Sequence, residues 1–143
     1  MQPEIKHNWF FPQPAETIWE FLTTPELLAQ WLMPNDFKPE TGQYFMFRTG
    51  PHPALNFDGN IYCQVLEIVP QKKLSYTWKY GPGKGITTVD SLVTWTLQPK
   101  NGGTELFLLH TGFDESINIM DYQAMNTGWQ TNVNKIEKLL SIK

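Results

Sequence analysis

The side chains best suited to chemistry in this chain are three histidines, one cysteine and a single arginine. His110 ends an apolar stretch, and because imidazole titrates near neutral pH it could orient the polar end of a ligand or donate a proton. A histidine in such a stretch is more often only hydrogen-bonded in place, since acid-base work also needs a partner within reach. Arg48 falls on the predicted inward register of its strand and could bind a carboxylate; an edge position with the charge in solvent is the alternative.

Other chemical constellations are missing from the sequence. No cysteine or carboxylate stands near His7, His52 or His110 at the spacing of metal ligands, so we predict no metal site. Cys63 lacks a nucleophile signature, and the glycine-rich run at 81–85 lacks the ending of a phosphate-binding loop. We therefore predict no catalytic residue and no cofactor.

Size and composition indicate one domain spanning residues 1–143, with 41% hydrophobic content. The net charge of -3 comes without runs of like charge, which disfavours nucleic acid and anionic membranes as partners. The lone cysteine cannot form an internal disulfide, and no apolar stretch is long enough for a signal peptide or a membrane span. We expect a reducing, cytoplasmic setting and no membrane insertion.

The last part of the chain must position whatever site exists. Apolar residues recur every three or four positions from Tyr122 to Leu140, which predicts a long amphipathic helix that Asn118 could cap. Its apolar face carries Met125 and Trp129 beside a mid-helix Gly128. This face needs a broad, concave apolar surface on which to lie.

The preceding chain is expected to supply that surface as an antiparallel six-stranded sheet. Alternating patterns predict strands at 4–11, 44–48, 61–69, 74–80, 88–97 and 104–111, and proline-flanked segments predict short helices at 14–22 and 25–33. The class is α+β, with the helices on one face of the sheet. Because connections in a meander alternate between its ends, the segments 49–59, 81–86 and 112–118 should meet at one end and surround a cavity mouth.

Aromatic residues make up 14% of the chain, including six tryptophans, more than a core of this size usually requires. The side chains predicted to face the helix could line a ligand cavity, or they could form an ordinary filled core. They are Tyr44, Met46, Tyr76, Trp78, Val93, Trp95, Leu106, Leu108 and His110 on strands, with Met125, Trp129 and Val133 on the helix.

Short motifs along nearly the whole chain resemble one family in their order and spacing. They comprise Pro14, Ile18, Trp19, Thr24, Pro25, Glu26 and Trp31, then Gly42, Pro70, Leu74 and Trp78, then Gly103, Thr104, Leu106, His110, Gly112, Phe113, Gly128 and Trp129. This pattern resembles the Aha-like proteins, related to the C-terminal domain of the activator of the large heat-shock-protein ATPase, in the START and pollen-allergen superfamily of helix-grip folds. The resemblance implies a cavity between a curved sheet and the terminal helix. The spacing between Gly59 and Pro70 looks longer than is usual in the family, which leaves the inward register of that strand open.

Three functions remain in competition. The favoured one is a binding protein, monomeric or weakly dimeric, for a small lipophilic ligand such as a lipid, a polyketide or an aromatic metabolite. The second is a stand-alone co-chaperone with a chaperone partner, as the resemblance implies. The third is an enzyme acting on a ligand inside the cavity. Fold alone does not decide among them.

Overall fold

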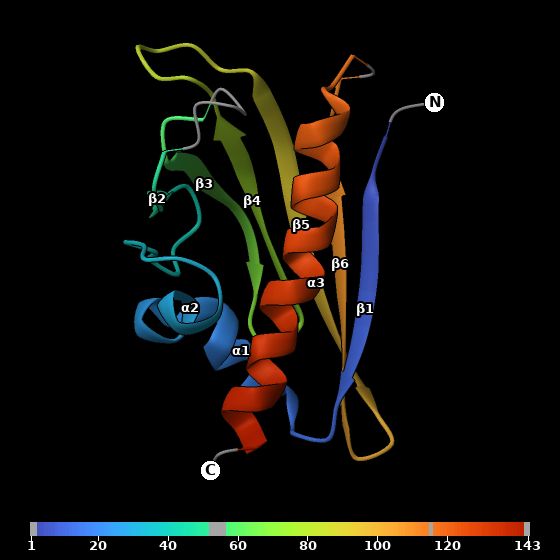
Figure 1. Ribbon diagram of the computed structural model, residues 1–143. Coiled ribbons are helices and arrows are strands. Elements are labelled where there is room, and N and C mark those ends of the chain that lie inside the picture. Colours follow the sequence, from blue (N-terminus) through green and yellow to red (C-terminus); the bar gives the residue numbers. More distant parts are fainter. Residues whose placement is uncertain (1–2, 52–56, 115, 142–143) are drawn as a thin grey trace.

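The protein is an open antiparallel sheet gripped by one long helix (Figure 1). The computed structural model describes residues 3–51, 57–114 and 116–141. Its six strands lie in the order β1-β6-β5-β4-β3-β2. The elements are β1 (Ile5–Phe11), α1 (Ala15–Thr23), α2 (Pro25–Trp31), β2 (Tyr44–Arg48), β3 (Asn60–Val69), β4 (Lys73–Tyr80), β5 (Val89–Lys100), β6 (Gly103–Thr111) and α3 (Ile119–Ser141). The predicted α+β class and helix-grip architecture are confirmed.

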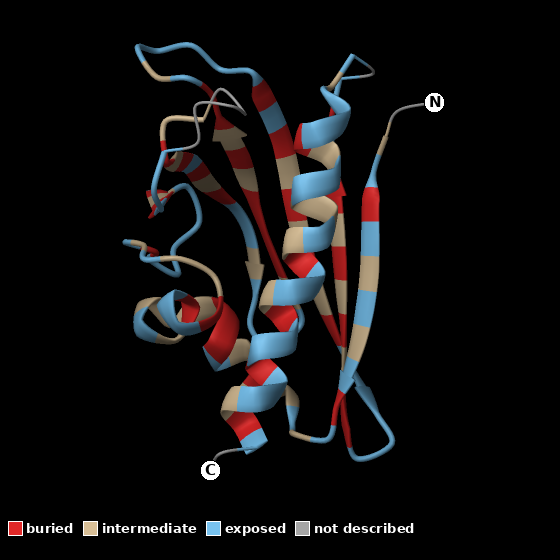
Figure 2. Ribbon diagram, in the orientation of Figure 1, coloured by how far each residue is buried: buried red, intermediate tan, exposed pale blue. Residues whose placement is uncertain are grey.

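Helix α3 begins where its capping residue predicts. The Asn118 Oδ1 atom accepts the backbone N–H of Met120 at 2.8 Å, which satisfies a free donor of the first turn. Buried residues recur along one side of α3 and face the sheet (Figure 2). The start of α3 is also tied to the residue that precedes β1. The Tyr122 hydroxyl donates a hydrogen bond to the backbone carbonyl of Glu4 at 2.7 Å. The helix is therefore fixed at its start and packed along its length.

Strand β2 has the opposite register from the one predicted. Tyr44 is 71% exposed, whereas Phe45 and Phe47 are 2% and 0% exposed and face the core. Met46 and Arg48 share the outer face with Tyr44, so the predicted inward placement of all three is wrong. The cause is that apolar side chains occupy both faces of this strand, so alternation cannot select one. The Asp36 carboxylate accepts the Met46 N–H at 2.7 Å and helps to hold the observed register.

Strand β3 contains a bulge in the segment between Gly59 and Pro70. Its pairing with β4 shifts between Val65 and Glu67, so that Leu66 is the extra residue and is 44% exposed. Ile61, Cys63 and Val65 point into the core. The bulge thus settles the register that the sequence left open.

The loose and tight connections separate to opposite ends of the sheet. The loop after β4 and the approach to α3 lie at the same end in Figure 1, and the turn between β5 and β6 lies at the other. Within the predicted mouth segments, residues 52–56 and 115 lie outside the described residues. No helix among the described residues is long and apolar enough to cross a bilayer.

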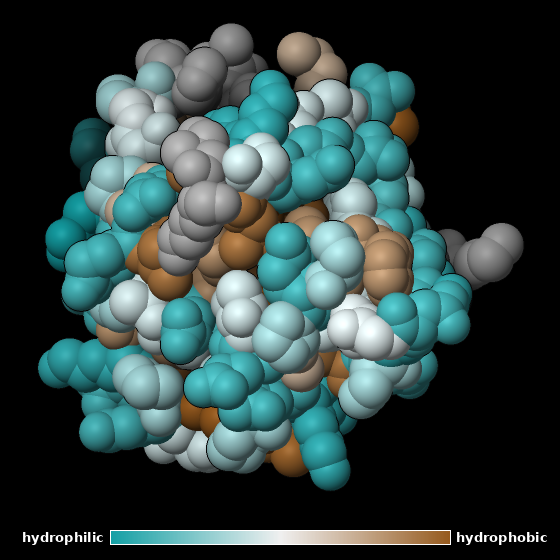
Figure 3. All heavy atoms as spheres, turned by 90° about the horizontal axis from the view of Figure 1, so that it is seen from below, coloured by the Kyte–Doolittle hydropathy of each residue, from teal (hydrophilic) through white to brown (hydrophobic). Residues whose placement is uncertain are grey.

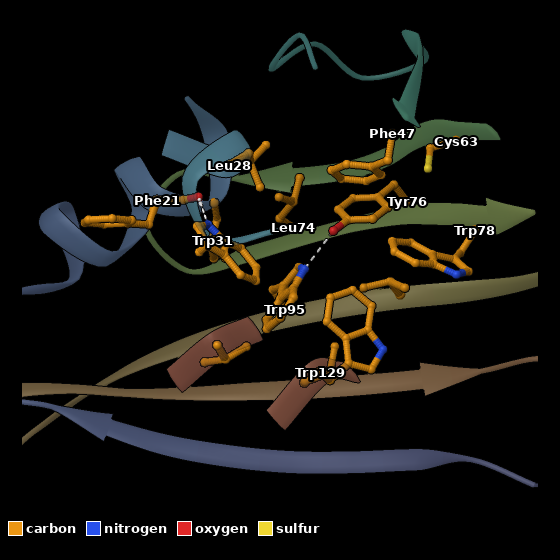
Figure 4. Close-up of a cluster of buried hydrophobic side chains, with 14 of the residues drawn as sticks. Phe21, Leu28, Trp31, Phe47, Cys63, Leu74, Tyr76, Trp78, Trp95 and Trp129 are labelled. Carbon is orange, nitrogen blue, oxygen red and sulfur yellow. Dashed lines mark hydrogen bonds between the residues drawn. The ribbon is translucent and has the colours of Figure 1, made fainter. Parts of the chain in front are cut away.

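Tryptophans fill the centre of the core (Figure 4). The ring of Trp95 meets those of Trp31 and Trp129 edge-on, with centroids 5.9 and 5.4 Å away. Trp95 Nε1 donates to the Tyr76 hydroxyl at 3.0 Å, and Trp31 Nε1 donates to the Phe21 carbonyl at 2.8 Å. Most of the aromatic surplus therefore packs against itself, and among the described residues the Trp78 indole N–H is buried without a hydrogen-bond partner.

Candidate functional site

A cavity of about 410 Å³ lies between α3 and the half of the sheet that carries β2, β3 and β4. It falls within the range of about 300 to 1,000 Å³ typical of small-molecule sites. Tryptophan, tyrosine, phenylalanine and aliphatic side chains dominate its wall. The lining residues are Leu32, Met33, Thr49, Phe57, Ile61, Trp78, Tyr80, Ala124, Met125, Gly128, Trp129 and Asn132. The opposite end of the molecule, where α3 finishes, presents mostly hydrophilic residues with small apolar patches (Figure 3).

Gly128 opens the helical wall of this cavity. A Cβ atom added at Gly128 would meet no atom within 4 Å, so the space beside the helix is empty. The residue does not have a positive φ and no neighbouring backbone approaches it closely. Neither a strained conformation nor close packing therefore requires a glycine here, although glycine costs a helix interior roughly 1 kcal/mol relative to alanine.

A series of buried hydrogen bonds connects two tryptophans of the cavity wall, Trp129 and Trp78. Trp129 Nε1 donates to His110 Nδ1 at 3.0 Å. A neutral imidazole then carries its proton on Nε2, which donates to Ser91 Oγ at 2.8 Å. The Ser91 hydroxyl donates in turn to the Trp78 carbonyl at 2.8 Å. This chain links α3 to β6, β5 and β4, and it occupies both nitrogens of His110.

Ser91 and His110 are close enough to resemble the nucleophile and base of a hydrolase, but their protons point the wrong way. A general base must accept the serine proton at its unprotonated nitrogen. Here Nε2 is the donor, because the Trp129 indole can only donate to Nδ1. Neither His110 nor Ser91 is among the residues that line the cavity, so neither contacts a ligand bound there. The pair is structural in this arrangement.

Burial lowers the pKa of His110 from 6.5 to about 3. The unfolded chain takes up a proton at this histidine near pH 6.5, whereas the folded protein does not, so stability present above pH 6.5 is lost as the pH falls towards 3. We expect His110 to lower the free energy of unfolding by about 1.4 kcal/mol per pH unit through this window. Urea unfolding of wild type and His110→Gln at a series of pH values measures that slope. An imidazolium nitrogen signal from His110 in folded protein near pH 5 would contradict the assignment.

The rim end of the cavity carries a buried tyrosine–aspartate pair. The Tyr80 hydroxyl donates to Asp121 Oδ1 at 2.7 Å, and each residue is 8% exposed. Burial first, and then the bond to Asp121, raises the pKa of the Tyr80 hydroxyl well above its usual value. The hydroxyl therefore keeps its proton and its bond to the start of α3.

Only part of the predicted site lines the cavity. Trp78, Met125 and Trp129 do so. Tyr44 and Met46 lie on the outer face of β2. The remaining predicted residues belong to the filled core and are not in the cavity wall, namely Tyr76, Val93, Trp95, Leu106, Leu108, His110 and Val133.

Several residues that line the cavity were not predicted from the sequence. Tyr80 continues the alternation of Tyr76 and Trp78 and could have been found from it. The mid-helix Gly128 was visible as an anomaly but gave no sign that it faces empty space. Leu32 and Met33 follow α2 and reach the cavity only through tertiary packing, so no local pattern marks them.

The remaining reactive side chains lie away from the cavity wall. Burial, and then the charge of Asp36, raises the pKa of the Cys63 thiol, which keeps it in its unreactive protonated form. Arg48 is exposed on the outer face of β2. Among the described residues, no three histidine, cysteine, aspartate or glutamate side chains are grouped so that they could hold a metal ion.

Comparisons with known proteins identify a matching family model and several similar solved structures. The family model described as "Activator of Hsp90 ATPase homolog 1-like protein" matches residues 12–141. The structure is similar to that of protein MLL2253 from Mesorhizobium loti, with 32% identity, a TM-score of 0.84 and coverage of 99% of this chain and 98% of that one. It is also similar to the Aha1 dimer from Colwellia psychrerythraea, with 18% identity, a TM-score of 0.73 and coverage of 94% and 92%.

A third similar structure is DynU16, a protein of the dynemicin biosynthetic locus. The identity is 21% and the TM-score 0.77, and the match covers 96% of this chain and 47% of DynU16. A comparison with curated proteins gives no match.

Proposed function

Because this chain belongs to the family of Activator of Hsp90 ATPase homolog 1-like proteins and has a ligand-binding fold, we propose that it binds a small lipophilic molecule in the cavity beside Gly128. The molecule lies against Trp78 on the sheet and Trp129 on α3, whose rings pack together in the cavity wall. Burial of apolar surface drives the binding. A lipid, a polyketide or an aromatic metabolite has the chemistry that such a wall accepts.

The observation that carries this proposal is the empty space at Gly128. An alanine there would fit without contacting any atom and would suit the helix better, yet the position is left without a side chain. The result is a wider apolar space at the middle of α3, where the cavity wall needs room for an occupant. A filled core would have no use for this arrangement, since interiors normally pack to high density.

The neighbour from the dynemicin locus gives the proposal one further support. A biosynthetic setting is one in which a lipophilic intermediate needs a binding protein. The compounds to try should span acyl chains, fused aromatic rings and polyketide-like molecules. Because apolar burial drives binding, affinity should change little between about 50 and 500 mM salt. A charge-led interaction would weaken clearly over that range.

We expect Gly128→Ala to raise the free energy of unfolding by about 0.5 to 1 kcal/mol. The new methyl group enters open space and the unfolded chain loses conformational freedom, so no packing cost opposes the gain. Denaturant unfolding of the two proteins under the same conditions measures the difference. A loss of stability would show that the space beside Gly128 is smaller than the structure has it.

A co-chaperone role is the second candidate, and exposed apolar residues at one end of the molecule favour it. Ile86 after β4, together with Ile119 and Met120 at the start of α3, are 57%, 62% and 55% exposed. We propose that this end could contact a chaperone ATPase, consistent with the name of the family. Stimulation of that ATPase by wild type but not by Ile119→Ser/Met120→Ser would favour the co-chaperone role.

The similar structure of Aha1 is a dimer. We propose that this protein is a monomer or a weak homodimer, and sedimentation would test its oligomeric state.

A further inference from the structure

We infer that the cavity beside Gly128 takes uncharged molecules and rejects anions of the same shape. This inference rests on the proposed function and adds the chemical class of the ligand to it. Two features of the structure carry it: the composition of the cavity wall, and a buried carboxylate bonded to one of the wall residues.

The wall offers no counter-charge. Of the described residues that line the cavity, Tyr80 alone has an ionisable side chain, and no lysine, arginine or histidine is among them. The other polar groups of the lining residues are neutral: the side chains of Thr49 and Asn132 and the indole N–H groups of Trp78 and Trp129. An anion entering this space would give up its hydration and find no positive group in return, which is costly in an apolar environment. A neutral molecule of the same shape loses far less.

Asp121 adds a repulsive term. Its carboxylate accepts the Tyr80 hydroxyl at 2.7 Å, directly behind the cavity wall, and it is 8% exposed. In the described part of the chain no lysine or arginine forms an ion pair with Asp121. Asp121 lies in the first turn of α3, where the helix dipole favours a negative charge. The Asp121 carboxylate is therefore placed next to the Tyr80 end of the cavity, where it would repel a bound anion.

Arg48, the single arginine of the chain, does not offset the negative charge of Asp121. Arg48 was the sequence's candidate for binding a carboxylate, but it lies on the outer face of β2 and is exposed. Among the described residues that line the cavity, none carries a positive charge, and the Asp121 carboxylate is bonded to one of them. Selection by charge follows from the wall itself and does not need any movement of the protein.

The test uses matched pairs of ligands that differ in charge and hardly in shape. We would measure the affinity of 2-naphthamide against 2-naphthoate, and of dodecanamide against dodecanoate, by calorimetry below micelle-forming concentrations. The amide of each pair should bind at least about tenfold more tightly than the acid. Equal affinities, or tighter binding of the acid, would overturn the charge selection while leaving the proposed function standing. Failure of every compound to bind would overturn both.

The variant Asp121→Asn separates the effect of the Asp121 charge from the effect of a cavity wall without positive groups. Asparagine keeps an oxygen that can accept the Tyr80 hydroxyl and removes only the charge. Amide affinity should stay the same, which also shows that the variant is folded, and the gap between amide and acid should narrow by about threefold to tenfold. An unchanged gap would overturn the role of Asp121. The matched amine, 2-naphthylmethylammonium, supplies the last arm: if it binds wild type more tightly than the amide, the cavity is a cation site and the inference is wrong.

Discussion

Replacing Trp129 with alanine is expected to lower the free energy of unfolding by about 3 to 5 kcal/mol. Trp129 is 2% exposed, and its ring centroid lies 4.9 Å from that of Trp78 and 5.4 Å from that of Trp95. The truncation removes these contacts and the hydrogen bond to His110 Nδ1, which would be left as a buried acceptor without its donor. Both losses act at the centre of the seam between α3 and the sheet. Urea unfolding measures the change.

Tyr44→Ala is the matched control for this variant. Tyr44 is also a large aromatic residue that the sequence placed inward, but it is 71% exposed on the outer face of β2. Its truncation should change stability by no more than about 0.5 kcal/mol. A loss below about 1 kcal/mol for Trp129→Ala, or an equal loss for both variants, would contradict the packing described for α3 and the register of β2.

Replacing Gly128 with phenylalanine should weaken ligand binding by about tenfold to a hundredfold while the protein stays folded. The new ring would occupy the open space beside the helix, where no neighbour stands within 4 Å of the added Cβ atom. A ligand would then have to displace the ring or bind with part of its surface uncovered. Helix propensity does not oppose the change, because glycine is the poorest helix former after proline.

Thr127→Phe serves as the control for Gly128→Phe. Thr127 precedes Gly128 on α3, is exposed and does not line the cavity. A ring placed there adds the same apolar surface to the protein without entering the cavity, so binding should match that of wild type. If both variants bind as wild type does, the ligand lies elsewhere. If both lose binding equally, the effect comes from the helix and not from the cavity.

The fold was largely predictable because its elements carry strong periodic patterns. Asn118 and the apolar stripe that ends at Leu140 marked α3, and alternation marked the strands. The predicted register of β2 was wrong for a physical reason. The run Tyr44–Phe45–Met46–Phe47 is apolar on both faces of the strand, so its sequence pattern fits either register equally well. Its register depends on pairing with β3 and on the bond from Asp36, which are contacts distant in sequence.

The site was less predictable because lining a cavity and filling a core use the same residue types. Trp95 and Trp78 looked equivalent in the sequence, yet Trp95 packs in the filled core and Trp78 borders the cavity. His110 looked like a candidate for chemistry until its two partners were placed, each 19 residues away along the chain. Such distinctions depend on how α3 sits over the sheet. No local pattern encodes them.

The indole N–H signals of the six tryptophans provide the most direct test of the central claim that this cavity binds a ligand. We would follow them by NMR while titrating the protein with a chemically broad panel of uncharged lipophilic compounds. Binding in the cavity should shift the signals of Trp78 and Trp129, which line it, and leave that of Trp19 on α1 in place. A shift of the Trp19 signal without shifts of Trp78 and Trp129, or no shifts with any compound, would contradict the claim.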